Sequence, residues 1–177
     1  QIEFMKVCQK KVKNILAICW GMQVAVTAAG GEVKKAKNSH IGIANEIEIN
    51  DIGLSNPLYK DKKKKFNSPA FNFDEVVKLP ENGICLASNK INRIQSLYFE
   101  TNRNKIWGLQ YHPEITYEKM IQLIEFRKEK LINFRNVFKD DTEVDNHIEF
   151  IRKEIFKSDK ENRMIEIKNW LRSLNAN

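Results

Sequence analysis

The sequence predicts an α/β fold, specifically a three-layer α/β/α sandwich with a mostly parallel central sheet. Three observations predict it: a helix, a buried strand and a second helix follow one another near the start, short strands fill the middle, and helices form the end. With 177 residues, of which 42% are hydrophobic, the chain is long enough for one domain with a sizeable core.

The first three elements follow from the spacing of apolar residues. Residues 3 to 12 carry theirs at helical spacing, which would lay one face of a helix against the sheet. These side chains are Phe4, Val7, Cys8 and Val12. The next stretch, "NILAIC", is short, continuous and apolar, as expected of a strand buried on both faces. A second helix is expected from about Met22 to Ala29, ended by Gly30 and Gly31.

Short strands, many of them alternating, are expected from Glu32 to Gln110. Asn, Gly, Pro and Asp turns separate them, so antiparallel strands should lie near the edge of the sheet. From Thr116 onward the pattern is helical.

Two pairs in the C-terminal part resemble capping boxes, namely Thr142 with Asp145 and Ser158 with Glu161. Each precedes an apolar stripe that should face the core, the alternative being that one stripe serves a partner helix. The stripes are Val144, Ile148, Ile151 and Ile155, then Met164, Ile167, Leu171 and Leu174.

Composition excludes several classes of function. The formal charge is +7, but basic residues are dense only from Lys60 to Lys65, among Asn, Pro and Ser, which favours a solvated loop over a nucleic-acid patch. The odd count of three cysteines, without metal-type spacing, predicts neither disulfides nor a metal site. No apolar run is long enough for a membrane span and no secretory signal opens the chain, so we expect a soluble, cytoplasmic protein. Because no glycine-rich phosphate-binding motif is present, we expect no cofactor.

Cys19 lies at the corner between the first strand and the second helix. Such a corner exposes a side chain, and the free amides at the start of a helix favour a negatively charged sulfur. Ala17 and Gly21 are the small neighbours that a nucleophile elbow needs, and the N–H of Trp20 would point toward an oxyanion. The alternative is that Cys19 is a small buried hydrophobe that ends a strand.

A thiolate nucleophile needs a base, and the chain has three histidines. His147 lies on a charged helical segment and is expected to face solvent, while His40 is expected in a polar loop. His112 differs, because it follows the apolar strand in "WGLQYHPE" and precedes Glu114 by two residues. Parallel strand ends meet at one edge of a sheet, so Cys19, His112 and Glu114 make a plausible nucleophile, base and orienting acid.

At this point the sequence resembles a known family. "ILAICWGMQ" and "WGLQYHPE" are similar to the two signatures of class I (triad-type) glutamine amidotransferases, G-x-C-x-G-x-Q and Q-x-H-P-E. The intervening "FNFDEVVKLPENGICLASN" and "IQSLYFE" also resemble the family, and the nearest subgroup is the amidotransferase domain of GMP synthase.

The resemblance implies a flavodoxin-like amidotransferase fold and a reaction. Cys19 would attack the side-chain amide of glutamine, form a γ-glutamyl thioester and release ammonia, while His112 moves the protons and Glu114 holds it. Gln23 would contact the bound glutamine, and Trp20 would supply one amide of the oxyanion hole. We expect one domain over residues 1–177, with the catalytic core in 1–126 and a helical extension in 127–177.

The sequence departs from the family pattern in three places. Ala17 replaces the usual first glycine, and Asn72 stands where many relatives have a histidine. The family also places about three strands, and a loop that gives the second oxyanion amide, before the cysteine motif. Here 18 residues precede Cys19, so we expect the N-terminal part of the domain to be missing.

Several functional hypotheses are therefore open. The first is a glutamine amidotransferase or glutaminase that passes ammonia to a separate synthetase subunit, because this chain shows no nucleotide-binding motif. The second is hydrolysis of γ-glutamyl peptides by the same triad. The third is a non-catalytic interaction module that lacks the second oxyanion donor. Nucleic-acid binding rests on charge alone and would predict salt-sensitive binding.

Overall fold

The computed structural model describes residues 1–101 and 104–174, and in these residues one six-stranded sheet has the order β1-β8-β7-β6-β3-β4. A second sheet pairs β2 with β5. The strands are β1 (Asn14–Ile18), β2 (Glu32–Ile41), β3 (Ala44–Ile49), β4 (Lys65–Ser68), β5 (Phe71–Lys78), β6 (Ile84–Ser88), β7 (Ser96–Glu100) and β8 (Lys105–Leu109). The helices are α1 (Ile2–Lys11), α2 (Trp20–Ala28), α3 (Asp51–Ser55), the 3-10 helix η1 (Pro57–Tyr59), α4 (Tyr117–Phe126), α5 (Lys128–Asn133), α6 (Asp141–Ile155), α7 (Lys160–Arg163) and α8 (Ile165–Leu174).

The α/β class is confirmed, but the expectation of a mostly parallel sheet is wrong for the described strands. β1 and β8 run parallel, whereas the pairs β3–β4, β3–β6, β6–β7 and β7–β8 are antiparallel. The connection from β6 to β7 spans residues 89–95, which is too short for the crossover that a parallel pair requires. Among the described strands, the one parallel pair, β1 with β8, is the pair that carries the two signature motifs.

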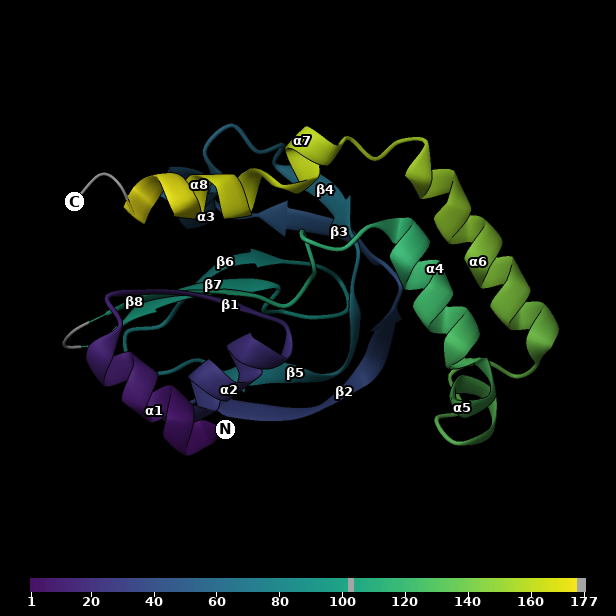
Figure 1. The fold of residues 1–177 in the computed structure, drawn as a ribbon, viewed down its shortest axis with the longest axis horizontal. Helices are drawn as coiled ribbons and strands as arrows, with labels where there is room; N and C mark the ends of the chain where they lie inside the picture. The colour runs from purple at the N-terminus through teal and green to yellow at the C-terminus, as the bar shows by residue number, and fades with distance from the viewer. Residues whose placement is uncertain (102–103, 175–177) are drawn as a thin grey trace.

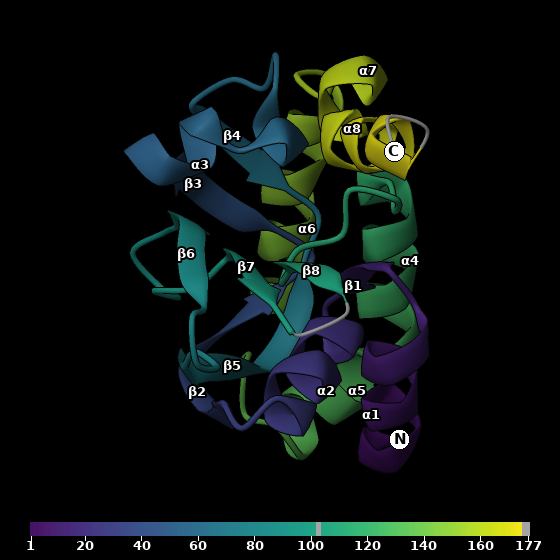
Figure 2. The same ribbon diagram turned by 90° about the vertical axis from the view of Figure 1, so that its left-hand side faces the viewer.

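Helices cover both faces of the central sheet, as expected of a three-layer arrangement (Figure 1). In β8, Ile106 points to the face covered by α2, where it packs in one cluster with Met22. Its neighbour Trp107 points to the opposite face and packs with Tyr59 of η1 and Trp170 of α8. Helices α4, α5 and α6 stand to one side of the sheet in Figure 1 and behind it in Figure 2, and they pack in one cluster with Ile41 of β2 and Phe71 of β5.

α1 forms where the sequence predicts a helix, but its apolar face does not lie on the sheet. Phe4 is 72% exposed, and Val7 and Val12 are also exposed. The helix packs on α2 instead, and the side-chain amide of the buried Gln9 donates to the carbonyl oxygen of Ala25. Periodicity therefore predicted the helix correctly and its contacts wrongly.

The C-terminal helices also differ in part from expectation. The α6 stripe is confirmed, because Val144, Ile148 and Ile151 are buried. The helix begins earlier than predicted, since Asp140 is the N-cap and accepts from the N–H of Glu143. Likewise, α7 is capped by Asp159 rather than by Ser158.

α8 buries polar residues instead of its predicted apolar stripe. Glu166 and Asn169 are its buried residues, whereas Leu171 and Leu174 are exposed. The partner of Glu166 is Lys62, whose side chain is 2% exposed although it belongs to the lysine run that was expected to be solvated. A buried ion pair thus joins α8 to the segment before β4.

Candidate active site

The parallel pairing of β1 with β8 brings the two motif segments together. Ile18 lies opposite Leu109, and the N–H of Cys19 donates to the carbonyl oxygen of Leu109 at 2.6 Å. Both strands therefore end at the same edge of the sheet, with Cys19 following one and His112 following the other. This meeting of strand ends was predicted from the sequence.

Cys19 has the backbone geometry of a sharp elbow. Its φ of 49° and ψ of −108° lie in a region that L-residues rarely adopt, which is the strain expected of a nucleophile between a strand and a helix. α2 begins at the next residue, Trp20, and the first N–H groups of a helix have no partner within it. A Cβ built on Gly21 would lie 3.9 Å from the Cβ of Ala17, so the small residues do face each other across the turn.

His112 is held by Glu114. The ring Nδ1 lies 2.6 Å from Oε1 of Glu114, and the backbone N–H of His112 donates to the carbonyl oxygen of Pro69. Because Glu114 occupies Nδ1, Nε2 is the ring atom that remains available to Cys19. The structure therefore brings the three predicted residues together; their catalytic roles stay a prediction.

The surroundings of His112 favour its charged form. Burial by itself lowers the pKa of the imidazole, but the hydrogen bonds and charges of Cys19 and Glu114 raise it by more, so that the pKa lies at about 9. A protonated imidazole next to the sulfur is the partner that stabilises a thiolate. The electrostatics of the site thus fit a cysteine nucleophile.

Gln110 is a site residue that the sequence reasoning did not single out. It is fully buried, and its Nε2 lies 3.5 Å from Sγ of Cys19, which also lies 3.9 Å from the carbonyl oxygen of Phe71. Its position along the chain could have identified it, because Gln110 directly follows β8 at the edge of the sheet where β1 also ends. Its amide can donate to a negatively charged sulfur.

Gln23 and Trp20 occupy the same side of α2. Both line a cavity of about 680 Å³, together with Asp74 of β5. Gln23 donates to the carbonyl oxygen of Asp74 at 3.0 Å and to Oε1 of Gln110 at 3.2 Å. Both of its amide hydrogens are thus used within the protein, and Gln110 links this cavity to the sulfur. The contact of Gln23 with bound glutamine stays a prediction.

The other two histidines are not where the sequence placed them. His40 belongs to β2 rather than to a loop, is 2% exposed, and bonds to the side-chain amide of Gln95; burial lowers its pKa to about 4. His147 is half-buried on α6, and its Nε2 lies 2.6 Å from the carbonyl oxygen of Ile41. Neither belongs to the group around Cys19.

Across residues 1–101 and 104–174, no cluster of three or more His, Cys, Asp or Glu side chains has an arrangement suited to a metal ion. In that same part of the chain, no helix has the length and apolar character needed to cross a membrane.

Comparisons with known proteins identify the family of the chain. The family profile "Glutamine amidotransferase class-I" matches residues 1–131. The chain is 34% identical over 120 residues to a gamma-glutamyl-L-1-hydroxyisopropylamide hydrolase of Pseudomonas, covering 66% of this chain and 40% of that protein. It is 32% identical over 123 residues to one subunit of the glutamine-hydrolyzing GMP synthase of Methanocaldococcus jannaschii, covering 70% of this chain and 59% of that protein.

The fold is also similar to that of solved structures. A glutamine amidotransferase from Thermotoga maritima superimposes with a TM-score of 0.69 at 18% identity, over 96% of this chain and 66% of that one. Compared with the two curated relatives named above, the chain spans 40% and 59% of their length.

Proposed function

Because the chain belongs to the class-I glutamine amidotransferase family, we propose that it hydrolyses the side-chain amide of glutamine at Cys19 and releases ammonia. The observation that carries this proposal is the meeting of Cys19, on a strained elbow, with an imidazole that Glu114 orients. A nucleophile, a base and an orienting acid in contact are the parts that acyl transfer requires.

The proposed reaction passes two protons through His112: the thiol proton leaves with ammonia, and a proton of water restores the thiol. Sγ of Cys19 would attack the amide carbon, and the N–H of Trp20 would stabilise the oxygen that becomes negative. His112 would carry the thiol proton to the amide nitrogen, which leaves as ammonia, so that a γ-glutamyl thioester remains. Water, deprotonated by the same imidazole, would then release glutamate and restore the thiol.

A second candidate reaction is hydrolysis of γ-glutamyl amides or peptides. It is favoured by the 34% identity to a gamma-glutamyl-L-1-hydroxyisopropylamide hydrolase. The thioester would be the same, and an amine would leave in place of ammonia. The leaving group is therefore what separates the two candidates.

For the glutaminase reaction we propose that a separate synthetase subunit receives the ammonia. The similarity to a protein named as one subunit of GMP synthase supports this proposal, because the name denotes a part of a larger enzyme. The chain itself carries no Walker or dinucleotide-binding motif.

The test is covalent labelling with a diazo-ketone analogue of glutamine, read by intact mass and peptide mapping. We expect one adduct, on Cys19, and none on the other two cysteines. Cys85 is a useful internal control, because burial raises the pKa of its thiol and makes it a poor nucleophile. Cys19→Ser should abolish the adduct.

Three results decide between the alternatives. Release of ammonia from glutamine supports the glutaminase, whereas faster release of an alkylamine from a γ-glutamyl alkylamide supports the second reaction. Absence of an adduct on protein whose Cys19 still reacts with iodoacetamide would contradict both and support a non-catalytic interaction module.

A further inference from the structure

The loop that carries His112 and Glu114 is irregular and has few backbone bonds of its own. Residues 110–116 lie between β8 and α4 and belong to neither element. Within the loop, the N–H of Ile115 donates to the carbonyl oxygen of His112 at 3.3 Å. The orientation of the catalytic pair therefore depends on what holds this loop from outside.

Arg163, at the end of α7, provides such a hold. Its Nη1 donates to the carbonyl oxygens of Pro113 and Ile115, the second at 2.9 Å. These two carbonyls flank Glu114, so one guanidinium group fixes the backbone on both sides of the orienting acid. An arginine suits this role because its planar, permanently charged group presents several donors in a fixed geometry.

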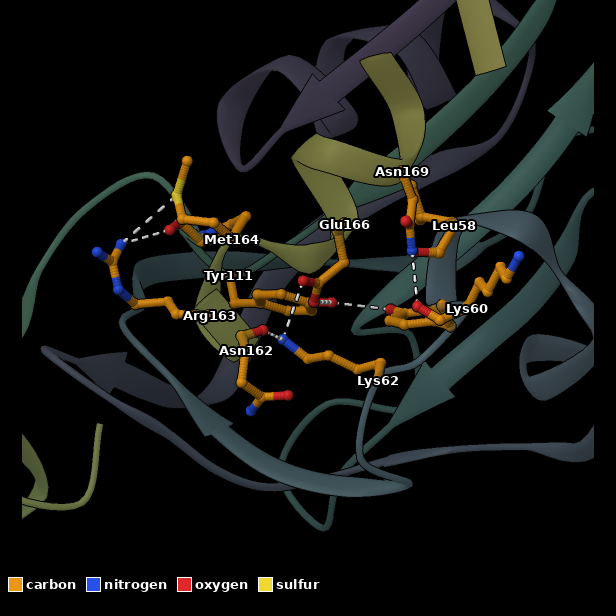
Figure 3. A network of polar contacts seen from close by, with 11 residues as sticks. Leu58, Lys60, Lys62, Tyr111, Asn162, Arg163, Met164, Glu166 and Asn169 are labelled. Atoms are coloured by element: carbon orange, nitrogen blue, oxygen red, sulfur yellow. Dashed lines mark hydrogen bonds and ion pairs between the residues drawn. The ribbon is translucent and has the colours of Figure 1, made fainter. Parts of the chain in front are cut away.

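A second anchor lies just before His112. The hydroxyl of Tyr111 donates to Oε1 of Glu166 at 2.6 Å and shares a hydrogen bond of 2.8 Å with Tyr59. The other carboxylate oxygen, Oε2, accepts from Lys62 at 2.9 Å. Figure 3 shows Arg163 and Glu166 coming from the same C-terminal segment, with Tyr111 between them. That segment thus holds the catalytic loop at both ends.

We propose that Arg163 is a positioning residue for the catalytic pair, acting through the carbonyl oxygens of Pro113 and Ile115. The proposal rests on the proposed function, since it takes His112 as the base for Cys19. Two facing groups raise the pKa of His112, the side chains of Cys19 and Glu114. Arg163 therefore acts by placing the loop rather than by its charge, and small displacements of a catalytic group have large effects on rate.

The experiment compares Arg163→Met and Arg163→Lys with a matched control, Arg152→Met. Arg152 is an exposed arginine of α6, and its guanidinium pairs with Glu149 of the same helix. Three quantities are measured for each variant: the pH profile of Cys19 alkylation by iodoacetamide, kcat and KM for glutamine, and the thermal unfolding midpoint. His112→Gln supplies the alkylation profile of a site without its base.

For Arg163→Met we expect kcat to fall about 10- to 100-fold while KM changes by less than about twofold. Its alkylation profile should move toward that of His112→Gln. Arg163→Lys keeps a cation that can donate and should recover part of the loss, and Arg152→Met should match the wild type. If Arg163→Met does not fold, Arg163→Gln, whose amide is too short to reach both carbonyls, takes its place with the same expectations.

If folded Arg163→Met keeps the wild-type alkylation profile and the wild-type kcat, the proposal is overturned. This holds even if its unfolding midpoint is lower, because the arginine would then act on stability alone. The alkylation arm needs no glutamine. A wild-type protein that releases no ammonia would therefore contradict the proposed function, while an unchanged profile would contradict the role of Arg163.

Discussion

Replacing Lys62 by methionine tests how α8 is attached to the sheet. Nζ of Lys62 donates to Oε2 of Glu166 at 2.9 Å and to the carbonyl oxygen of Asn162 at 2.7 Å, and it lies 4.3 Å from the centre of the Phe66 ring. The side chains of Lys62 and Glu166 are 2% and 0% exposed. Lys62→Met would leave the Glu166 carboxylate buried without its cation, which costs about 3–5 kcal/mol in the free energy of unfolding.

When both charges are removed together, we expect most of the lost stability to return. Burial lowers the pKa of Lys62 more than its attraction to Glu166 raises it, so the pair as a whole is a weak stabiliser. Lys62→Met combined with Glu166→Leu should therefore regain most of the loss. The coupling energy from the double-mutant cycle should exceed about 2 kcal/mol.

Urea unfolding followed by circular dichroism measures these differences, with the slope used to check that unfolding remains two-state. Lys64→Met is the matched control, because Lys64 is half exposed and its Nζ lies 4.0 Å from Glu48 and 3.9 Å from Asp51. Such a surface pair should contribute less than about 0.5 kcal/mol. A cost below about 1 kcal/mol for Lys62→Met, or a double variant as unstable as the single one, would refute the reasoning.

Three further predictions concern the catalytic edge. Because Glu114 helps to raise the pKa of His112 to about 9, Glu114→Gln should lower this pKa by about one unit, measured by NMR titration of the imidazole; an unchanged pKa would contradict the pairing. The raised pKa also means that protonated His112 stabilises the folded state fully below its ordinary pKa, and that this contribution is lost as the pH rises through about 9. The unfolding midpoint of the wild type should therefore fall between the ordinary pKa of histidine and about pH 9, whereas that of His112→Gln should not. Gly108→Ala would place a Cβ 2.5 Å from Cγ of Met22 and should cost about 1–3 kcal/mol by urea unfolding, whereas a neutral effect would show that α2 can shift.

The order of elements and the catalytic group could be read from the sequence, because both depend on short-range patterns. A continuous apolar run before Cys19 and another before His112 identify two strands, and parallel strands bring their ends to one edge. The expectation that both faces of the first strand are buried is wrong, because β1 lies at the edge of the described sheet and Ala17 is its one buried residue. Helix periodicity placed α6 and its buried face correctly. In each case the residues that carry the signal are neighbours along the chain.

Tertiary structure decided the pairings between distant polar residues. Lys62 lies in a run that reads as solvated, yet it is buried because Glu166, far along the chain, supplies the opposite charge. In α8, the face that carries Glu166 is buried against its polar partners, so Leu171 on another face is exposed. The spacing of apolar residues therefore did not predict which face of α8 is buried. Arg163 reaches the catalytic loop in the same way. The sequence by itself determined the family, the candidate catalytic residues and the strands that precede them. The folded chain determined which residues hold these strands and loops in place, because a polar contact is specified by two positions that no local pattern connects.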